Sequence, residues 1–289
     1  MSTTIKNPVE WGWDQIARAA SAIGSAGPAL HHIQDTMHSP APTVRRIGVN
    51  DVKDALLQGL DDFGAFRSDV VFLCIVYPVV GLIFSQFIFG NEMMPLLFPI
   101  ASGFALVGPF AALGLYEMSR RRERGLPVSW LHAFDVVRAP AFGAIAVLGL
   151  ALVALFLLWL TAAWGIYRVT LGPELPTSIS AFASDIVTTQ EGWTMIAAGI
   201  GVGFVFALVA MTISIASFPL LVDRDVGLDT AIRTSIKVVT ENPGPMAVWG
   251  MVVAGSLALG SIPFFIGLIV VMPTLGHATW HLYRKTVAR

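Results

Sequence analysis

The chain has 289 residues, of which 55% are hydrophobic and 13% are charged, and 18 basic against 19 acidic residues leave a formal net charge of −1. An ordinary soluble domain is about one-quarter charged, so this composition excludes a soluble enzyme and a disordered chain, and the balanced charge excludes a nucleic-acid-binding protein. A single cysteine, Cys74, excludes an intrachain disulfide framework. The class that remains is an integral membrane protein.

The first predicted unit is a flexible cytoplasmic N-terminal arm over residues 1–50. It is rich in Ala, Ser, Gly, Pro and His, and it lacks the apolar segment of a signal peptide. Residues 39–42, Ser-Pro-Ala-Pro, are typical of a flexible linker. The second predicted unit is a membrane domain over residues 51–289.

Five windows without Asp, Glu, Lys or Arg are long enough to hold membrane-spanning helices, which need about 20 apolar residues. The windows are Val70–Asn91, Met93–Tyr116, Ala139–Tyr167, Gly192–Val222 and Asn242–Tyr283. The last window is long enough for two helices and is interrupted by Gly-Ser-Ile-Pro at 260–263, a cluster typical of a turn. The windows therefore predict six transmembrane helices, of which the fifth, at about Pro245–Leu259, is the shortest.

The basic residues predict the orientation of these helices. Six spans place 17 of the 18 basic residues on one side of the membrane, with only Arg168 on the other. Because cytoplasmic loops carry an excess of Lys and Arg, both termini are expected in the cytoplasm.

A threefold pattern precedes the first, third and fifth predicted spans. Each of these stretches has apolar residues at positions i, i+4 and i+7, the spacing of one helical face. The residues are Leu56, Leu60 and Phe63; Trp130, Phe134 and Val137; and Ile232, Ile236 and Val239. The fold class predicted is therefore an all-α membrane protein of three hairpins, each preceded by an amphipathic helix in the cytoplasmic interface, in a threefold pseudo-repeat.

Two histidines near the C-terminus, His277 and His281, are separated by four residues, so they share one helix face in a geometry that metal sites use. No glutamate completes a metalloprotease motif, and no third ligand lies nearby in sequence. We therefore favour a structural role for both histidines and predict no metal and no cofactor site.

The densest charge cluster follows the second predicted span. Its members are Glu117, Arg120, Arg121, Arg122 and Arg124. Such a cluster can bind an anionic lipid head group or an acidic partner surface. The alternative, which we favour, is that the arginines anchor the topology, as the positive-inside rule requires.

Ionisable residues are absent from the predicted span interiors, where they would mark proton relays and ion paths. This absence argues against a proton-coupled pump and against an intramembrane acid–base enzyme, and we predict no catalytic residue. An enzyme remains the third alternative, and it could act only at the cytoplasmic rim through Glu117, His277 and His281.

Four segments resemble a family of bacterial integral membrane proteins that is catalogued as a domain of unknown function and is common in alphaproteobacteria. They are FRSDVVFL at 66–73, GLYEMSRR at 114–121, FPLLVDRD at 218–225 and GHATWH at 276–281. The resemblance covers about residues 45–288 and implies a six-helix inner-membrane protein. Some members carry the label of a cytochrome c oxidase subunit, which implies an accessory or assembly role, since the spans here lack histidine ligands for haem and copper.

The function predicted first is a non-catalytic accessory, assembly or scaffold protein of the inner membrane, with the lipid bilayer and a respiratory complex as partners. The alternative is a transporter or channel for a neutral or apolar solute or lipid. A cavity at the interface of the repeats, lined by Ser102, Thr212 or Ser256, would favour the alternative, and a solidly packed bundle would count against it.

Overall fold

The computed structural model describes residues 36, 39–74, 94–262 and 266–288, and helices account for nearly all of the secondary structure in these ranges. The helices are α3 (Val49–Cys74), η1 (Met94–Leu96), α5 (Leu97–Ala111), α6 (Leu113–Glu123), η2 (Trp130–Arg138), α7 (Phe142–Thr170), α8 (Ile179–Thr188), α9 (Gln190–Ser214), α10 (Ser217–Asp223), α11 (Leu228–Glu241), α12 (Pro243–Ser261) and α13 (Leu268–Thr286).

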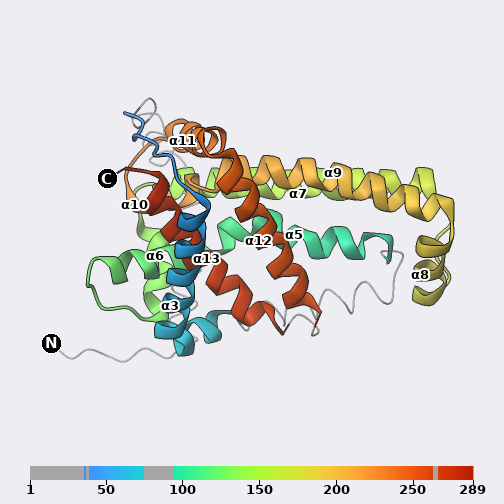
Figure 1. Ribbon diagram of the computed structural model, residues 1–289, viewed down its shortest axis with the longest axis horizontal. Coiled ribbons are helices and arrows are strands. Elements are labelled where there is room, and N and C mark those ends of the chain that lie inside the picture. The colour runs from blue at the N-terminus through green and yellow to red at the C-terminus, as the bar shows by residue number, and fades with distance from the viewer. Residues whose placement is uncertain (1–35, 37–38, 75–93, 263–265, 289) are drawn as a thin grey trace.

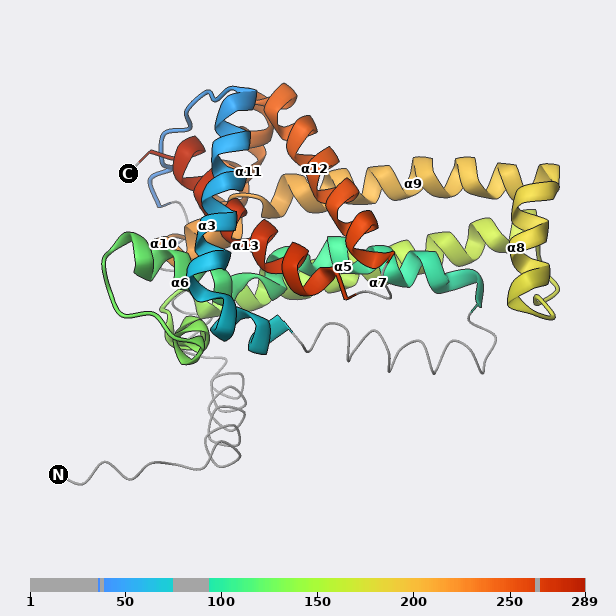
Figure 2. The same cartoon turned by 60° about the horizontal axis from the view of Figure 1, so that its bottom comes forward.

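The molecule has two parts, which we call the head and the extension. The head contains α3, α6, η2, α10, α11 and the C-terminal half of α13, and the extension consists of α5, α7 and α9, with α8 across its far end (Figures 1 and 2). Helix α12 crosses from the head over α5 and α9. The buried hydrophobic core lies mainly in the head and continues into the start of α7.

Three of the described helical segments are long and apolar enough to cross a membrane. They are α7, the consecutive pair α9 and α10 over Gln190–Asp223, and α12. Much of their apolar surface is uncovered, and Leu150 of α7 is 68% exposed. Such a surface is unfavourable in water and ordinary against lipid. The prediction of an all-α integral membrane protein is therefore confirmed, and the third, fourth and fifth predicted spans correspond to these segments.

The six-helix count and the threefold repeat are not confirmed. Most of the first predicted span, Val70–Asn91, lies outside the described residues. The second predicted span, Met93–Tyr116, is divided at Ala112 into α5 and α6, three residues after Pro109, which has no N–H group for the helical ladder. Helix α13 corresponds to the sixth predicted span, but most of its length is buried inside the protein.

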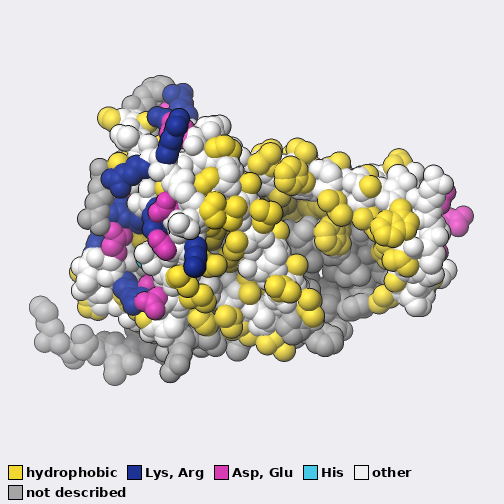
Figure 3. All heavy atoms as spheres, in the orientation of Figure 1, with side chains coloured by type: hydrophobic (Ala, Val, Ile, Leu, Met, Phe, Trp, Pro, Cys, Tyr) yellow, Lys and Arg dark blue, Asp and Glu magenta, His cyan; other side chains and the backbone are white. Residues whose placement is uncertain are grey.

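The charged side chains are sorted along the molecule. Lys and Arg gather over the head, and hydrophobic side chains cover the extension on the face drawn in Figure 3. On this face the charged residues therefore lie mainly over the head, and the charge-poor segments that the sequence predicts as spans form the extension.

The three stretches with the repeated apolar pattern form the start of α3, η2 and α11. In α3 the buried face is made by Val52, Ala55, Gly59 and Asp62, whereas Leu60 of the apolar pattern is exposed. In α11 the buried face likewise consists of small or polar residues. Mostly small side chains therefore form the buried faces. Of the apolar pattern, Leu60, Phe134 and Ile236 are exposed, whereas Leu56, Phe63, Ile232 and Val239 are partly buried against the core.

The predicted flexible linker at residues 39–42 leads into a segment that packs on the head. The Arg45 N–H group donates to the Thr286 carbonyl at 2.7 Å, and the Ala288 N–H group donates to the Thr43 carbonyl at 2.9 Å. The Thr230 hydroxyl donates to the Ser39 carbonyl at 2.9 Å. These contacts place residues 39–48 against α11 and the end of α13, and the flexibility of the arm stays a prediction. Residues 1–35, 37 and 38 lie outside the described part of the chain.

Helices α3 and α13 approach each other closely at Gly59. A Cβ atom added to Gly59 would lie 2.6 Å from the Ala278 backbone nitrogen and 2.7 Å from the Thr274 carbonyl oxygen. Only glycine allows this approach, because any side chain would overlap backbone atoms. The approach brings Asp62, one turn further along α3, against the histidines of α13.

Candidate functional site

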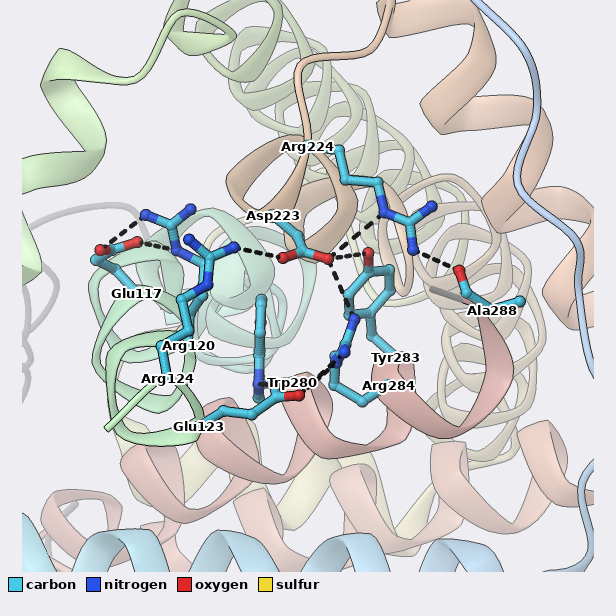
Figure 4. A network of polar contacts seen from close by, with 10 residues as sticks. All are labelled: Glu117, Arg120, Glu123, Arg124, Asp223, Arg224, Trp280, Tyr283, Arg284 and Ala288. Carbon is cyan, nitrogen blue, oxygen red and sulfur yellow. Dashed lines mark hydrogen bonds and ion pairs between the residues drawn. The ribbon is translucent and has the colours of Figure 1, made fainter. Parts of the chain in front are cut away.

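The ends of α6, α10 and α13 meet in the head (Figure 4). Asp223, the last residue of α10, lies at the centre of this meeting point. It accepts hydrogen bonds from the Tyr283 hydroxyl at 2.9 Å, from Arg284 Nη1 at 3.2 Å and from Arg124 Nη2 at 3.2 Å. One carboxylate thereby joins three segments that are far apart in the sequence.

Glu123 forms a second junction between α6 and α13. It accepts from Trp280 Nε1 at 3.3 Å and from Arg284 Nε and Nη2 at 3.1 and 3.0 Å. Both Arg284 nitrogens contact Oε1 and Trp280 contacts Oε2, so the two oxygens of one carboxylate join the end of α6 to α13.

Each arginine of the predicted cluster contacts an acidic group of the same chain. Arg120 pairs with Glu117, Arg121 with Asp135, Arg122 with Asp62, and Arg124 with Asp223. The cluster therefore ties α6 to α3, η2 and α10. Contact of these residues with a lipid or a partner stays a prediction.

A second polar cluster surrounds Asp62, which is only 2% exposed. Its Oδ2 atom accepts a hydrogen bond from the Ser119 hydroxyl at 2.5 Å and lies 2.8 Å from His281 Nε2. Its Oδ1 atom accepts from Arg122 Nη1. The Ser119 hydroxyl also lies 2.7 Å from His277 Nδ1. The cluster thus links α3, α6 and α13.

The contacts of Asp62 determine its charge. Burial raises the pKa of the carboxyl group, but the hydrogen bonds from His281 and Ser119 and the nearby histidine charges outweigh burial and lower the pKa to about 2. Asp62 is therefore ionised at neutral pH. The sequence analysis missed both Asp62 and Ser119; the available signal was a single acid on the small-residue face of α3.

The two predicted metal candidates, His277 and His281, do lie on one face of α13, and both are turned toward Asp62. A structural role for both histidines stays a prediction. Among the residues that the structure describes, no group of three or more His, Cys, Asp or Glu side chains is suited to hold a metal ion.

The polar cluster opens onto a small surface pocket of about 270 Å³ that is lined by Asp62, Ser119 and His281. The cluster contains serine, histidine and aspartate, as the active site of a serine hydrolase does, but the hydrogen bonds between them are arranged differently. In a catalytic triad the serine donates to the histidine and the histidine donates to the acid. Here the Ser119 hydroxyl donates directly to Asp62. Glu117, the third residue of the rim alternative, pairs with Arg120 instead of joining this cluster.

A larger cavity of about 640 Å³ lies between α5, α6, α9, α12 and α13. Its size is typical of small-molecule sites, which span about 300–1,000 Å³. The lining includes Leu106, Met211, Trp249 and Met272, and none of the lining residues that the structure describes is Asp, Glu, Lys, Arg or His. The bundle is thus hollow where these helices meet.

The hydroxyl groups that line this cavity differ from those predicted. Tyr116, Ser214 and Thr279 line it, whereas Ser102, Thr212 and Ser256 do not. The Ser102 hydroxyl accepts from Trp159 Nε1 at 3.0 Å, and the Thr212 hydroxyl donates to the Leu208 carbonyl on an exposed surface. A cavity is present, but Ser102, Thr212 and Ser256, whose place in the lining would favour transport, do not line it, because the sequence does not define how each helix is rotated about its axis.

Comparison with known proteins finds a family model that matches part of the chain. No curated protein and no solved structure matches it. A model of the family described as "Predicted integral membrane protein (DUF2189)", a domain of unknown function, matches residues 97–223, which is less than the range of about 45–288 expected from the resemblance. The matched range extends from α5 to α10. Residues 97–223 are therefore similar to this family of predicted integral membrane proteins.

Proposed function

We propose that this protein binds a neutral or apolar solute or lipid inside the membrane, in the cavity between α5, α6, α9, α12 and α13. The observation that carries the proposal is the cavity itself. A protein that serves only as a scaffold has no need of a hollow of this size, because protein interiors are normally close-packed. The cavity therefore favours the binding or transport alternative over the accessory role.

The position of the cavity supports access from the membrane. Phe204 and Leu208 of α9 and Leu257 of α12 line it, and both helices belong to the candidate spans. Phe204 and Met251 are largely exposed as well as lining the cavity. The cavity thus reaches the surface that faces lipid in a spanning orientation, and a ligand can enter sideways from the bilayer.

The chemistry of the lining supports an uncharged ligand. A charged group near the centre of a bilayer costs about 2.5–3.5 kcal/mol on the insertion scale unless it is paired. The described lining offers no Asp, Glu, Lys or Arg to form such a pair.

Two glycines of α12 allow a matched test. A Cβ atom added to Gly250 would lie 3.7 Å from the sulfur of Met211, a lining residue, so Gly250→Phe directs a ring into the cavity. A Cβ atom added to Gly255 would have no described atom within 4 Å, so Gly255→Phe places the same ring outside the cavity. Both changes replace glycine in one helix, so their effects on helix propensity are equal.

The experiment purifies the full chain and both variants in mild detergent and quantifies the extracted lipids and apolar solutes by mass spectrometry. We expect the wild type and Gly255→Phe to retain one enriched uncharged compound, and Gly250→Phe to lose most of it. Equal retention by both variants, or no enriched compound in the wild type, would contradict the proposal. A stoichiometric protein partner together with an empty cavity would instead support the accessory role.

The orientation belongs to the same proposal. The gathering of Lys and Arg over the head supports a cytoplasmic head and six spans with both termini inside (Figure 3). A reporter that is active only in the cytoplasm should be active when fused to the C-terminus. An active periplasmic reporter at that end would refute this orientation.

A further inference from the structure

One hydroxyl group of the cavity stands out because it is buried without a partner. Ser214 is 1% exposed, lines the cavity, and its Oγ atom has no hydrogen-bond partner among the described residues. Other hydroxyls on these helices bond to a carbonyl of the preceding turn, as Thr279 does with Leu275 and Thr212 does with Leu208. A buried hydroxyl without a partner is unfavourable and calls for an explanation.

The lining residues that carry hydroxyl groups gather at one end of the cavity. Ser214 is the last residue of α9 and lies at the head, as do Tyr116 of α6 and Thr279 in the C-terminal half of α13. Phe204, ten residues earlier on α9, lies about 15 Å away along the helix axis. The lining toward Phe204 is apolar, with Leu208 and Leu257 beside it. The cavity therefore matches a molecule with a polar group at one end and a hydrocarbon chain at the other.

We propose that the cavity takes an uncharged amphiphile whose hydroxyl or carbonyl group forms a hydrogen bond with Ser214 and whose chain lies along α9 toward Phe204. This inference rests on the proposed function and names the class of its ligand. Because the described lining holds no Asp, Glu, Lys, Arg or His, a fatty acid or a phospholipid head group would enter without a counter-charge. His277, next to the lining residue Gly276, is directed toward Ser119 instead.

The test uses three probes with the same sixteen-carbon chain and the same photoreactive diazirine: hexadecane, hexadecanol and palmitate. The full-length protein in nanodiscs is labelled with each probe, and the modified peptides are identified by mass spectrometry. We expect hexadecanol to label the α9 and α12 lining more strongly than the other two probes. Ser214→Ala should lower hexadecanol labelling by roughly two- to ten-fold, as expected for one lost hydrogen bond, and leave hexadecane labelling unchanged.

Thr212→Ala is the matched control, because Thr212 is on the same helix, its hydroxyl donates to the Leu208 carbonyl, and it lies outside the lining. It should leave the labelling pattern of the wild type unchanged. If Ser214 had only a structural role, its replacement by alanine would lower the melting temperature. Since the Ser214 hydroxyl has no partner to lose, Ser214→Ala should keep or slightly raise the melting temperature while it weakens hexadecanol labelling.

The outcomes separate this inference from the proposed function. Equal cavity labelling by hexadecane and hexadecanol, with no effect of Ser214→Ala, would overturn the inference and leave the proposed function intact. Stronger labelling by palmitate would overturn it in favour of an anionic ligand. Absence of labelling in the cavity by all three probes would overturn both.

Discussion

Replacing Asp62 by asparagine tests the network that joins α3 to α6 and α13. The change keeps the shape of the side chain and removes the negative charge that holds Ser119, His281 and Arg122. The pKa of Asp62 is about 2 in the folded protein, against an ordinary value of 3.8. Since one pKa unit corresponds to about 1.4 kcal/mol, the ionised carboxylate stabilises the folded state by about 2 kcal/mol at neutral pH.

The sign of the pH dependence follows from the lowered pKa. A group whose pKa is lower in the folded state stabilises the protein at pH values above its unfolded pKa. The contribution of Asp62 is therefore complete above about pH 4 and is lost as the pH falls from about 4 to about 2. We expect the stability difference between the wild type and Asp62→Asn to disappear over this interval.

The assay is thermal unfolding of the full chain in detergent micelles, followed by circular dichroism between pH 2 and pH 7. A loss of about 2 kcal/mol corresponds to a melting temperature roughly 4–8 °C lower at pH 7. Asp61→Asn is the control, because Asp61 is the exposed neighbour of Asp62 and should leave the melting temperature almost unchanged. An Asp62→Asn variant as stable as the wild type at pH 7, or a difference that persists at pH 2, would refute the reasoning.

Two further predictions concern packing in the head, and urea unfolding in detergent micelles measures both. Gly59→Ala should destabilise the protein by about 1–3 kcal/mol, because the new methyl group would overlap the backbone of Ala278, whereas Gly64→Ala, in open space on the same helix, should stabilise it by about 0.5–1 kcal/mol. Tyr283→Phe should cost about 1.5–3 kcal/mol, because the Tyr283 hydroxyl donates to the charged Asp223. Gly59 and Gly64 variants of equal stability, or an unchanged midpoint for Tyr283→Phe, would contradict these assignments.

Much of the architecture could be predicted because exclusion of charge from hydrocarbon is a property of each segment by itself. The windows Ala139–Tyr167 and Gly192–Val222 correspond to α7 and to α9 with α10, and the shortest predicted span corresponds to α12. The same reasoning failed at Met93–Tyr116, where hydropathy shows one window but Pro109 and the packing of α6 in the head divide it.

The candidate site was less predictable. The spacing of His277 and His281 correctly placed them on one face of a helix, since that depends only on the helical period. Their partner Asp62 lies more than two hundred residues earlier in the chain, and only the close approach of α3 to α13 at Gly59 brings it to them. The arginine cluster was visible in the sequence, but its acidic partners on α3, η2 and α10 were not.

The sequence by itself determined that the protein is helical and embedded in a membrane, and it located the most apolar helices, because burial in lipid requires only local hydrophobicity. Tertiary structure alone decided which side chains meet. The ionised Asp62, the junction at Asp223 and the cavity beside Ser214 all depend on how separate helices are rotated and how closely they approach. Those two quantities arise from packing between segments that are distant in the chain, and no local pattern encodes them.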